Sequence, residues 1–388
     1  MFKREIIDTA SKVIPNAGKI GVAVSGGGDS VFMLLVLKQG GHDIEAITVD
    51  HGLRPEAATE AEWVSELCKS IGVPHRIMRW TEHENIRNIQ GDARNARYDL
   101  IREWADERGI SQVAIGHNED DIAENWLIRE QGILPVIERG GVNYFKPLLS
   151  FPRDFIRNEL SAIDQKWFDD PSNDDEHYAR VKMRKRIRKN PEVREEALSK
   201  AHAHVQRVML DSEVAREMVG HDVWVTRRGT VAINPEAVSR EPEIAKIIIR
   251  ASLRITGDLN PSIRGRSINR AVQSIIDGKG FSLAGSIYDP KRQEFFREKG
   301  RAPITSMTDH GVWDGRWEIV LNGWDEVGPK SGTGPAVPFG YRKELVSKRF
   351  LPDDTDLIRL MTPGVDESMD ISHRVHMPEP ADDPDIGP

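Results

Sequence analysis

The sequence predicts an α/β protein whose N-terminal half is a parallel sheet with helices on both faces, followed by a smaller α+β domain. In the first half, three apolar strand-like runs each lead into a polar turn and then into a helical stretch. Alternating strands and helices form parallel sheets, which bind ligands at the carboxyl ends of their strands. The three runs with their turns are Lys19 to Val24 before SGGGDS, Ile44 to Val49 before DHGLRPE, and Gln112 to Ile115 before GHNEDD.

Further elements fill the space between the second and third of these strands. A helix is expected around Glu60 to Ser70, a short strand near His75 to Met78, and a long helix from Asp92 to Arg108. Gly109 follows as the C-cap of the long helix. The N-terminal domain is therefore expected to span residues 1–190, ending where Asn190-Pro191 signals a break.

The second half divides into three expected parts. Residues 191–218 form a charged helical linker, and residues 219–325 form an accessory domain of short strands and helices such as Glu241 to Thr256. Residues 326–388 end in an acidic, proline-rich tail, EPADDPDIGP, which is expected to be disordered. Catalytic motifs are found only in the first half, so the chemistry is expected there.

Composition limits the classes of site. The chain has 388 residues and 38% hydrophobic content, enough for two or three domains with cores of their own. Cys68 is its one cysteine, which rules out an internal disulfide, a CxxC redox pair and a multi-cysteine metal site within the chain. The N-terminus lacks a signal-peptide core and no run is long enough to cross a bilayer, so a cytoplasmic protein is expected.

The charge distribution limits where nucleic acid can bind. A formal net charge of −8 argues against a globally basic surface, so any RNA site must be a local patch. The run ARVKMRKRIRKN is such a patch, although charge runs often serve only as solvated helix faces. Its candidate RNA-binding residues are Arg180, Lys182, Arg184 and Arg186.

The turn Ser25-Gly26-Gly27-Gly28-Asp29-Ser30 has the features of a phosphate-binding loop. It joins a strand to a helix, consecutive glycines let backbone N–H groups face an anion, and the helix N-terminus adds partial positive charge. It lacks the GxxxxGK[ST] lysine of a Walker A loop and the GxGxxG spacing of dinucleotide folds.

The other two turns supply carboxylates and histidines beside that loop. Asp50-His51 follows the second strand, and Gly116-His117 follows the third. Asp120, Asp121 and Glu124 then open a helix, with Asp120 and Glu124 on one face at i, i+4 spacing. Acidic residues here can be mere helix caps, but carboxylates facing a triphosphate are also a usual way to hold Mg²⁺.

Together these segments resemble the tRNA(Ile)-lysidine synthase family within the PP-loop ATP pyrophosphatases, whose loop the SGGGDS turn matches. The family patterns VDHGLR, NLQ…AR..RY, GH..DD..ET, RPLL and W..DPSN occur here in the same order, and the resemblance is strong over residues 18–190. Here they read VDHGLR, NIQGDARNARY, GHNEDDIAEN, KPLL and WFDDPSN. The resemblance implies a Rossmann-like, adenine nucleotide alpha hydrolase-like domain, with residues 219–325 as its tRNA-binding or accessory partner.

The resemblance also implies a reaction and roles. Cytidine O2 in the CAU anticodon of tRNA(Ile) attacks the α-phosphate of ATP, and the ε-amine of L-lysine then attacks C2 and displaces AMP, giving lysidine. ATP and Mg²⁺ would be the cofactors and tRNA(Ile) and lysine the partners; a homodimer is one of the oligomeric states left open. Asp29, Asp120, Asp121 and Arg94 would be catalytic, and Asp29 and Asp121 would hold Mg²⁺. Nucleotide binding would use the six loop residues with Asp50, His51, Arg97, Gly116 and His117, although Arg94 and Arg97 could also be surface salt-bridge partners.

Three departures from the family pattern keep alternatives open. Asn125 replaces a threonine, Val181 replaces an asparagine, and the segment after Leu127 lacks the family's arginine-rich RL.RGSG pattern. ATP binding is therefore better supported than the identity of the modified base. The alternatives are another PP-loop enzyme acting on a different base or nucleotide, and a catalytically reduced tRNA-binding protein.

Overall fold

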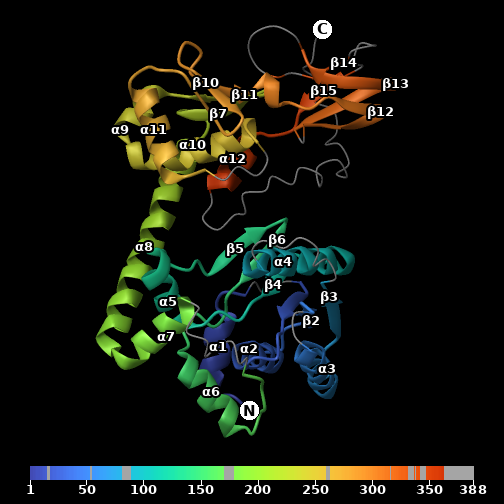
Figure 1. The fold of residues 1–388 in the computed structure, drawn as a ribbon, viewed down its shortest axis with the longest axis vertical. Helices are drawn as coiled ribbons and strands as arrows, with labels where there is room; N and C mark the ends of the chain where they lie inside the picture. The colour runs from blue at the N-terminus through green and yellow to red at the C-terminus, as the bar shows by residue number, and fades with distance from the viewer. Residues whose placement is uncertain are drawn as a thin grey trace. The chain divides into compact units, whose positions relative to one another are not determined.

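The fold is described from a computed structural model of the chain (Figure 1). The structure describes residues 1–14, 18–52, 55–80, 89–169, 179–258, 263–314, 316–330, 336, 338–340 and 347–361. The chain forms two compact units, Met1–Val208 and Met209–Pro388, and each is described by itself.

The first unit is built on a six-stranded sheet with the order β3-β2-β1-β4-β6-β5. Neighbouring strands are parallel from β3 to β6, and only β5, at the edge, is antiparallel to its neighbour. This confirms the predicted parallel sheet. The strands are β1 (Ile20–Ala23), β2 (Ile44–Asp50), β3 (His75–Arg79), β4 (Gln112–Ala114), β5 (Val136–Arg139) and β6 (Val142–Phe145).

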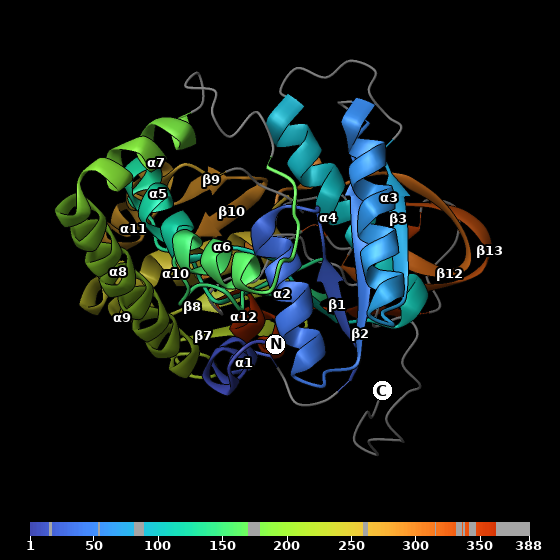
Figure 2. The ribbon, with the colours of Figure 1, turned by 90° about the horizontal axis from the view of Figure 1, so that it is seen from below.

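Helices cover both faces of this sheet. Apolar residues of β1 and β2 alternate between two cores, as the strand period of two requires: Ala46 packs with α1, α2, α3 and α6, whereas Ile47 packs with α4. In Figure 2, α2 and α3 lie side by side, and α2 contacts β1 while α3 contacts β2 and β3. The helices are α1 (Arg4–Ser11), α2 (Gly28–Gln39), α3 (Pro55–Ser70), α4 (Ile89–Arg108) and α6 (Arg153–Ala162).

One glycine allows α4 to approach the sheet closely. A Cβ added to Gly21 of β1 would lie 2.8 Å from the ring of Trp104 on α4. Trp104 is fully buried, and only a residue without a side chain leaves room for it there.

Three helices form a separate cluster beside the sheet. Ile122 and Ala123 of α5 (Glu119–Arg129) pack with Ile187 of α7 (Ala179–Lys189) and with the N-terminal part of α8 (Pro191–Glu217). The cluster fixes the acidic first turn of α5 beside the basic helix α7.

The second unit has a helix-backed antiparallel sheet and a second, smaller sheet. The first sheet has the order β7-β8-β11-β10-β9, and its core includes residues of α9, α10, α11 and α12 and of the end of α8. The second sheet pairs β12, β14 and β15 with β13. Strand β13 runs through residues 325 and 326, where the accessory domain was expected to end. The elements are β7 (Val223–Thr226), β8 (Thr230–Ile233), α9 (Pro235–Arg240), α10 (Pro242–Thr256), α11 (Gly265–Ile276), β9 (Phe281–Leu283), β10 (Ser286–Asp289), β11 (Glu294–Arg297), β12 (Thr305–Trp313), β13 (Trp317–Pro329), β14 (Pro338–Gly340), β15 (Ser347–Phe350) and α12 (Asp354–Met361).

A buried arginine joins the second sheet to α10. Arg316, just before β13, is 1% exposed and donates to the carbonyl oxygens of Arg254, Ile255 and Gly257 at the end of α10. These are carbonyls that a helix C-terminus leaves without partners. The guanidinium also pairs with Asp314 at 3.3 Å, so the turn between β12 and β13 is held to the helix end.

In the described part of the chain, no helix is long and apolar enough to cross a membrane. The predicted disordered tail, EPADDPDIGP, lies outside the described residues.

Candidate functional site

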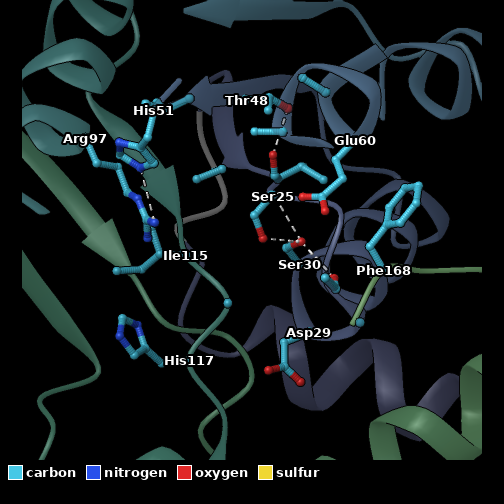
Figure 3. A pocket seen from close by; sticks show the side chains of 18 of the residues that line it. Ser25, Asp29, Ser30, Thr48, His51, Glu60, Arg97, Ile115, His117 and Phe168 are labelled. Carbon is cyan, nitrogen blue, oxygen red and sulfur yellow. Dashed lines mark hydrogen bonds between the residues drawn. The ribbon is translucent and has the colours of Figure 1, made fainter. Parts of the chain in front are cut away.

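The predicted loops meet at the point where the strand order reverses. Because β1 lies between β2 and β4, the turns that follow these strands gather at one edge of the sheet, where doubly wound folds bind their ligands. A cavity of about 540 Å³ opens there (Figure 3), lined by residues of all three predicted turns and of the helices α3, α4, α6 and α7.

The glycine loop has the geometry of an anion cradle. The Ser30 hydroxyl donates to the carbonyl oxygen of Gly27 at 2.9 Å and accepts from the N–H of Ser25 at 3.1 Å. Gly26 has φ +86°, in the left-handed region that favours glycine. The Phe168 N–H donates to the carbonyl oxygen of Gly26 at 2.9 Å, so the WFD segment holds the loop from outside. Five of the six loop residues, all except Gly26, line the cavity.

Asp29 stands in the first turn of α2 and lines the cavity (Figure 3). One of its oxygens accepts a hydrogen bond from the Asn118 amide at 3.0 Å, and Nε of Arg153 lies 4.0 Å away. Burial raises the pKa of Asp29 to about 6, although Arg153 and Asn118 pull it down. Ionising this carboxylate is therefore costly, and a cation beside it would lower that cost.

The turn after β2 contributes a carboxylate and a histidine. Asp50 is buried and accepts from the N–H of Gly52 at 2.9 Å. His51 Nε2 lies 3.4 Å from an Nη of Arg97 on α4. Asp50, His51 and Arg97 line the cavity, whereas Gly52 is not among the described lining residues. Figure 3 shows the His51–Arg97 pair across from the glycine loop. The side chain of Arg94, predicted on the same helix, lies outside the described residues.

The turn after β4 approaches the glycine loop directly. A Cβ added to Gly116 would lie 3.3 Å from the N of Ser30, so the absence of a side chain lets the two turns pack together. Gly116 and His117 both line the cavity. Their predicted place beside the loop therefore agrees with the structure.

Asn118, which the sequence reading did not single out, caps α5 and thereby determines which of its side chains face the cavity. Its side chain accepts from the N–H of Asp121 at 3.1 Å, while Asp121 accepts from the N–H of Asn118 at 3.0 Å, a reciprocal capping box. Asp121 consequently lines the cavity. An Asn three residues before an Asp, at the start of a helical pattern, was the available sequence signal.

Asp120 points elsewhere. It accepts from the N–H of Arg153 at 2.7 Å and from Nε of Arg194 on α8 at 2.9 Å, and it is not among the described residues that line the cavity. Burial would raise the pKa of Asp120, but these hydrogen bonds and the two arginine charges hold it below its usual value. Glu119 is the second carboxylate that Arg194 holds. Of the predicted acidic pair, the structure brings Asp121 and not Asp120 to the cavity.

Arg153, at the start of α6, is a second residue of this site that sequence reasoning missed. Its guanidinium contacts Asp121 at 3.2 Å and Glu124 at 3.1 Å, besides lying near Asp29. Glu124 is fully buried and also accepts from Nε of Arg184 on α7 at 2.9 Å. An arginine directly after Ser-Phe-Pro at a helix start gives no sequence signal for these contacts, because its partners lie far away in the chain.

The basic helix α7 contributes to the same cavity. Arg180 and Arg184 line it, whereas Lys182 and Arg186 are exposed and are not among the described lining residues. The predicted patch therefore has two parts. Arg184 is engaged with Glu124, and the exposed residues remain available to a partner at the surface.

The departures from the family pattern have local explanations. Asn125 donates to the carbonyl oxygen of Gln131 at 2.7 Å, which fastens the turn after α5. Val181 is 4% exposed, so an apolar side chain suits its place on α7. The altered segment forms β5, the antiparallel edge strand.

The described residues contain no group of three or more His, Cys, Asp or Glu side chains that could enclose a metal alone. Mg²⁺ bound with a nucleotide needs only one or two carboxylates beside phosphate oxygens. Asp29 fits that requirement: it is partly buried, and no hydrogen bond from a described residue is found on its second oxygen.

Comparisons with known proteins identify the family of this chain. Residues 2–191 match the model of the PP-loop domain. A tRNA(Ile)-lysidine synthase of Zymomonas mobilis is 32% identical over 296 residues, covering 70% of this chain and 86% of that protein. One of Ruegeria pomeroyi is 31% identical, covering 79% and 77%. A solved U34-tRNA thiolase of Methanococcus maripaludis aligns with 18% identity and a TM-score of 0.45, covering 52% of this chain and 78% of that one. The PP-loop match and the identity and coverage of these relatives agree with the loop and cavity described above. The chain therefore belongs to the tRNA(Ile)-lysidine synthase family.

Proposed function

We propose that this protein ligates L-lysine to C2 of the wobble cytidine of tRNA(Ile) with a CAU anticodon, at the expense of ATP. The cytidine O2 attacks the α-phosphate of ATP and releases pyrophosphate; the lysine ε-amine then attacks C2 and releases AMP. The observation that carries the proposal is a shared cavity: the phosphate loop and two arginines of the basic helix α7 line the same space. A nucleotide and an RNA base can meet there.

The loop residues Ser25 to Ser30 would bind the pyrophosphate part of ATP. Backbone N–H groups at the start of α2 and the Ser25 hydroxyl supply donors, and the helix N-terminus favours negative charge. Asp50, His51 and Arg97, with Gly116 and His117, also line the cavity, and we place the rest of the nucleotide against them. Arg94 is retained as a candidate catalytic residue on the family pattern alone.

Mg²⁺ would be held by Asp29, with Asp121 as the neighbouring carboxylate. When bound, it would offset negative charge on the phosphates. Asp121 is already hydrogen bonded on both oxygens, so it suits a role as an oriented acceptor for a proton of the lysine amine. Asp120, whose oxygens face α6 and α8, is better suited to holding these helices than to chemistry.

The tRNA would contact α7 through exposed Lys182 and Arg186, while Arg180 lies at the cavity itself. Phosphate contacts of this kind position an RNA without reading its sequence. The anticodon loop is single-stranded, so delivering one unstacked base to a pocket costs little. ATP and tRNA are cytoplasmic substrates, and we place the protein there.

In the second unit, α11 offers a further RNA contact. Its buried face consists of Ile268, Ala271, Val272 and Ile275, and its opposite face carries exposed Arg266 and Arg270. Neither arginine forms an ion pair with any residue that the structure describes, and the first turn has no acidic residue. In a chain with net charge −8, two unpaired guanidinium groups one turn apart are suited to phosphates.

The test is incubation of the purified protein with ATP, Mg²⁺, radiolabelled lysine and either tRNA(Ile) with a CAU anticodon or the methionine tRNA with the same anticodon. Lysine incorporated only into tRNA(Ile), with one AMP per lysine, is the expected result. AMP release without lysine incorporation would mean that a nucleophile other than lysine is used. No AMP release at all would favour a tRNA-binding protein without catalysis. Asp29→Asn should be inactive, whereas Lys200→Ala, an exposed residue of α8, should match the unaltered protein.

A further inference from the structure

We propose that Arg153 is a positioning residue, whose guanidinium gathers the carboxylates of Asp29, Asp121 and Glu124 and so fixes the acidic wall of the cavity. The inference rests on the proposed function and adds a residue that acts through the carboxylates it contacts rather than on ATP, lysine or the tRNA base. It follows from the geometry of α6 and from the charges that this helix faces.

The contacts place Arg153 between two elements that must keep a fixed relation. Asp29 belongs to the phosphate loop and the start of α2, whereas Asp121 and Glu124 belong to α5. The guanidinium reaches all three, at 4.0, 3.2 and 3.1 Å, and its side chain is only 12% exposed. The Arg153 N–H adds a hydrogen bond to Asp120 at 2.7 Å, so both the backbone and the side chain of this residue hold α5.

The charges require such a residue. Three carboxylates, of which Glu124 is fully buried, would repel one another and also the phosphates of ATP without a cation among them. Arg153 contacts all three carboxylates, and Arg184 contacts the same oxygen of Glu124 as Arg153 does. The guanidinium keeps its charge in this place, because arginine does not lose its proton in proteins.

Arginine is suited to this place and lysine is not equivalent to it. The planar guanidinium sends separate N–H groups to Asp121 and Glu124, through Nη2 and Nη1. A lysine ammonium keeps the charge but is a single point that cannot hold both carboxylates in the same geometry. Charge and geometry can therefore be separated experimentally.

We would compare Arg153→Lys, Arg153→Gln and the control Arg194→Lys. Arg194 is a matched control because it also holds two carboxylates of α5, Glu119 and Asp120, but is not among the described cavity-lining residues. Lysidine formation would be measured as kcat and as KM for ATP, at a temperature where all variants are folded by circular dichroism.

Arg153→Lys should lower kcat by about 10- to 100-fold with KM for ATP changed less than about threefold, since a displacement of about 1 Å can cost 100-fold. Arg153→Gln, which also removes the charge, should raise KM for ATP by about tenfold or more. Arg194→Lys should reduce the melting temperature and leave both constants within about threefold.

A kcat for Arg153→Lys within threefold of the unaltered protein, or an equal loss in Arg194→Lys, would overturn the proposal. If Arg153→Gln does not fold, the two lysine variants still decide. If the unaltered protein forms no lysidine, the proposed function is wrong, independently of the role of Arg153. The role of Arg153 would then be tested by calorimetric binding of ATP. Equal ATP affinities of Arg153→Lys and Arg153→Gln would contradict it.

Discussion

Asp29→Asn should stabilise the free protein at pH 8 although it removes a residue that we assign to the site. Burial raises the pKa of Asp29 from 3.8 to about 6. Folded Asp29 therefore holds its proton more tightly than unfolded Asp29, and the associated stability, complete below pH 3.8, is lost as the pH rises through 6. Asparagine stays neutral, so the variant does not lose this stability as the pH rises.

The size of the effect follows from that difference in pKa. A rise from 3.8 to about 6 corresponds to about 3 kcal/mol. Because 27% of the Asp29 side chain is exposed, water screens part of this cost, and we expect about 1 to 3 kcal/mol. For a unit of this size each kcal/mol changes the melting temperature by roughly 2 to 4 °C.

Asp120→Asn is the control of opposite sign. Burial raises the pKa of Asp120, but the hydrogen bonds and charges of Arg153 and Arg194 together have the larger effect and lower it. Ionised Asp120 therefore stabilises the fold above pH 3.8. This stabilisation is lost as the pH falls through the lowered pKa. Asp120→Asn should therefore melt at a lower temperature at both pH 8 and pH 4.5, whereas about one third of the gain of Asp29→Asn should remain at pH 4.5.

The assay is thermal melting by circular dichroism in EDTA without ATP, at both pH values. A lower melting temperature for Asp29→Asn at pH 8, or a difference that does not depend on pH, would refute the reasoning that burial destabilises this carboxylate.

Three further predictions concern RNA and ATP. Charge reversal of Lys182 and Arg186 together should weaken tRNA binding and reduce the slope of log affinity against log salt by about 1 for each lost phosphate contact; an unchanged slope in a filter-binding titration would make α7 a solvated face. Arg266→Glu with Arg270→Glu should weaken tRNA binding in the same assay but leave the calorimetric affinity for ATP unchanged, and equal tRNA affinity would exclude α11 as a contact. Gly26→Ala should cost about 1 to 2 kcal/mol of backbone strain at φ +86° and weaken ATP binding; unchanged ATP affinity by calorimetry would exclude Gly26 as a requirement of the cradle.

Much of the first unit could be predicted because its signals are local. The strand expected at Ile44 to Val49 is β2, Ile44–Asp50, and the helix expected at Asp92 to Arg108 is the greater part of α4. Apolar runs that end in glycine or polar turns specify such boundaries from a few neighbouring residues. The meeting of the three turns in one cavity then follows from the topology of a parallel sheet.

What could not be predicted depends on contacts between distant segments. Helical spacing placed Asp120 and Glu124 on one face of α5, but the spacing does not say which face meets the cavity; the cap by Asn118 and the pairing with Arg194 decide that. The role of Arg153 similarly depends on carboxylates from two other helices. The edge strand β5 was hidden in a segment known from the sequence only by its departure from the family pattern.

The bond between Arg316 and α10 has a consequence for shortening the protein. A truncation after β11 would remove the guanidinium that satisfies the last carbonyls of α10, and it would also remove Leu357 and Leu360 of α12 from the core of the second unit. The smaller sheet is therefore not an appendage that can be trimmed away. A version of the second unit that resists limited proteolysis should extend at least through Met361.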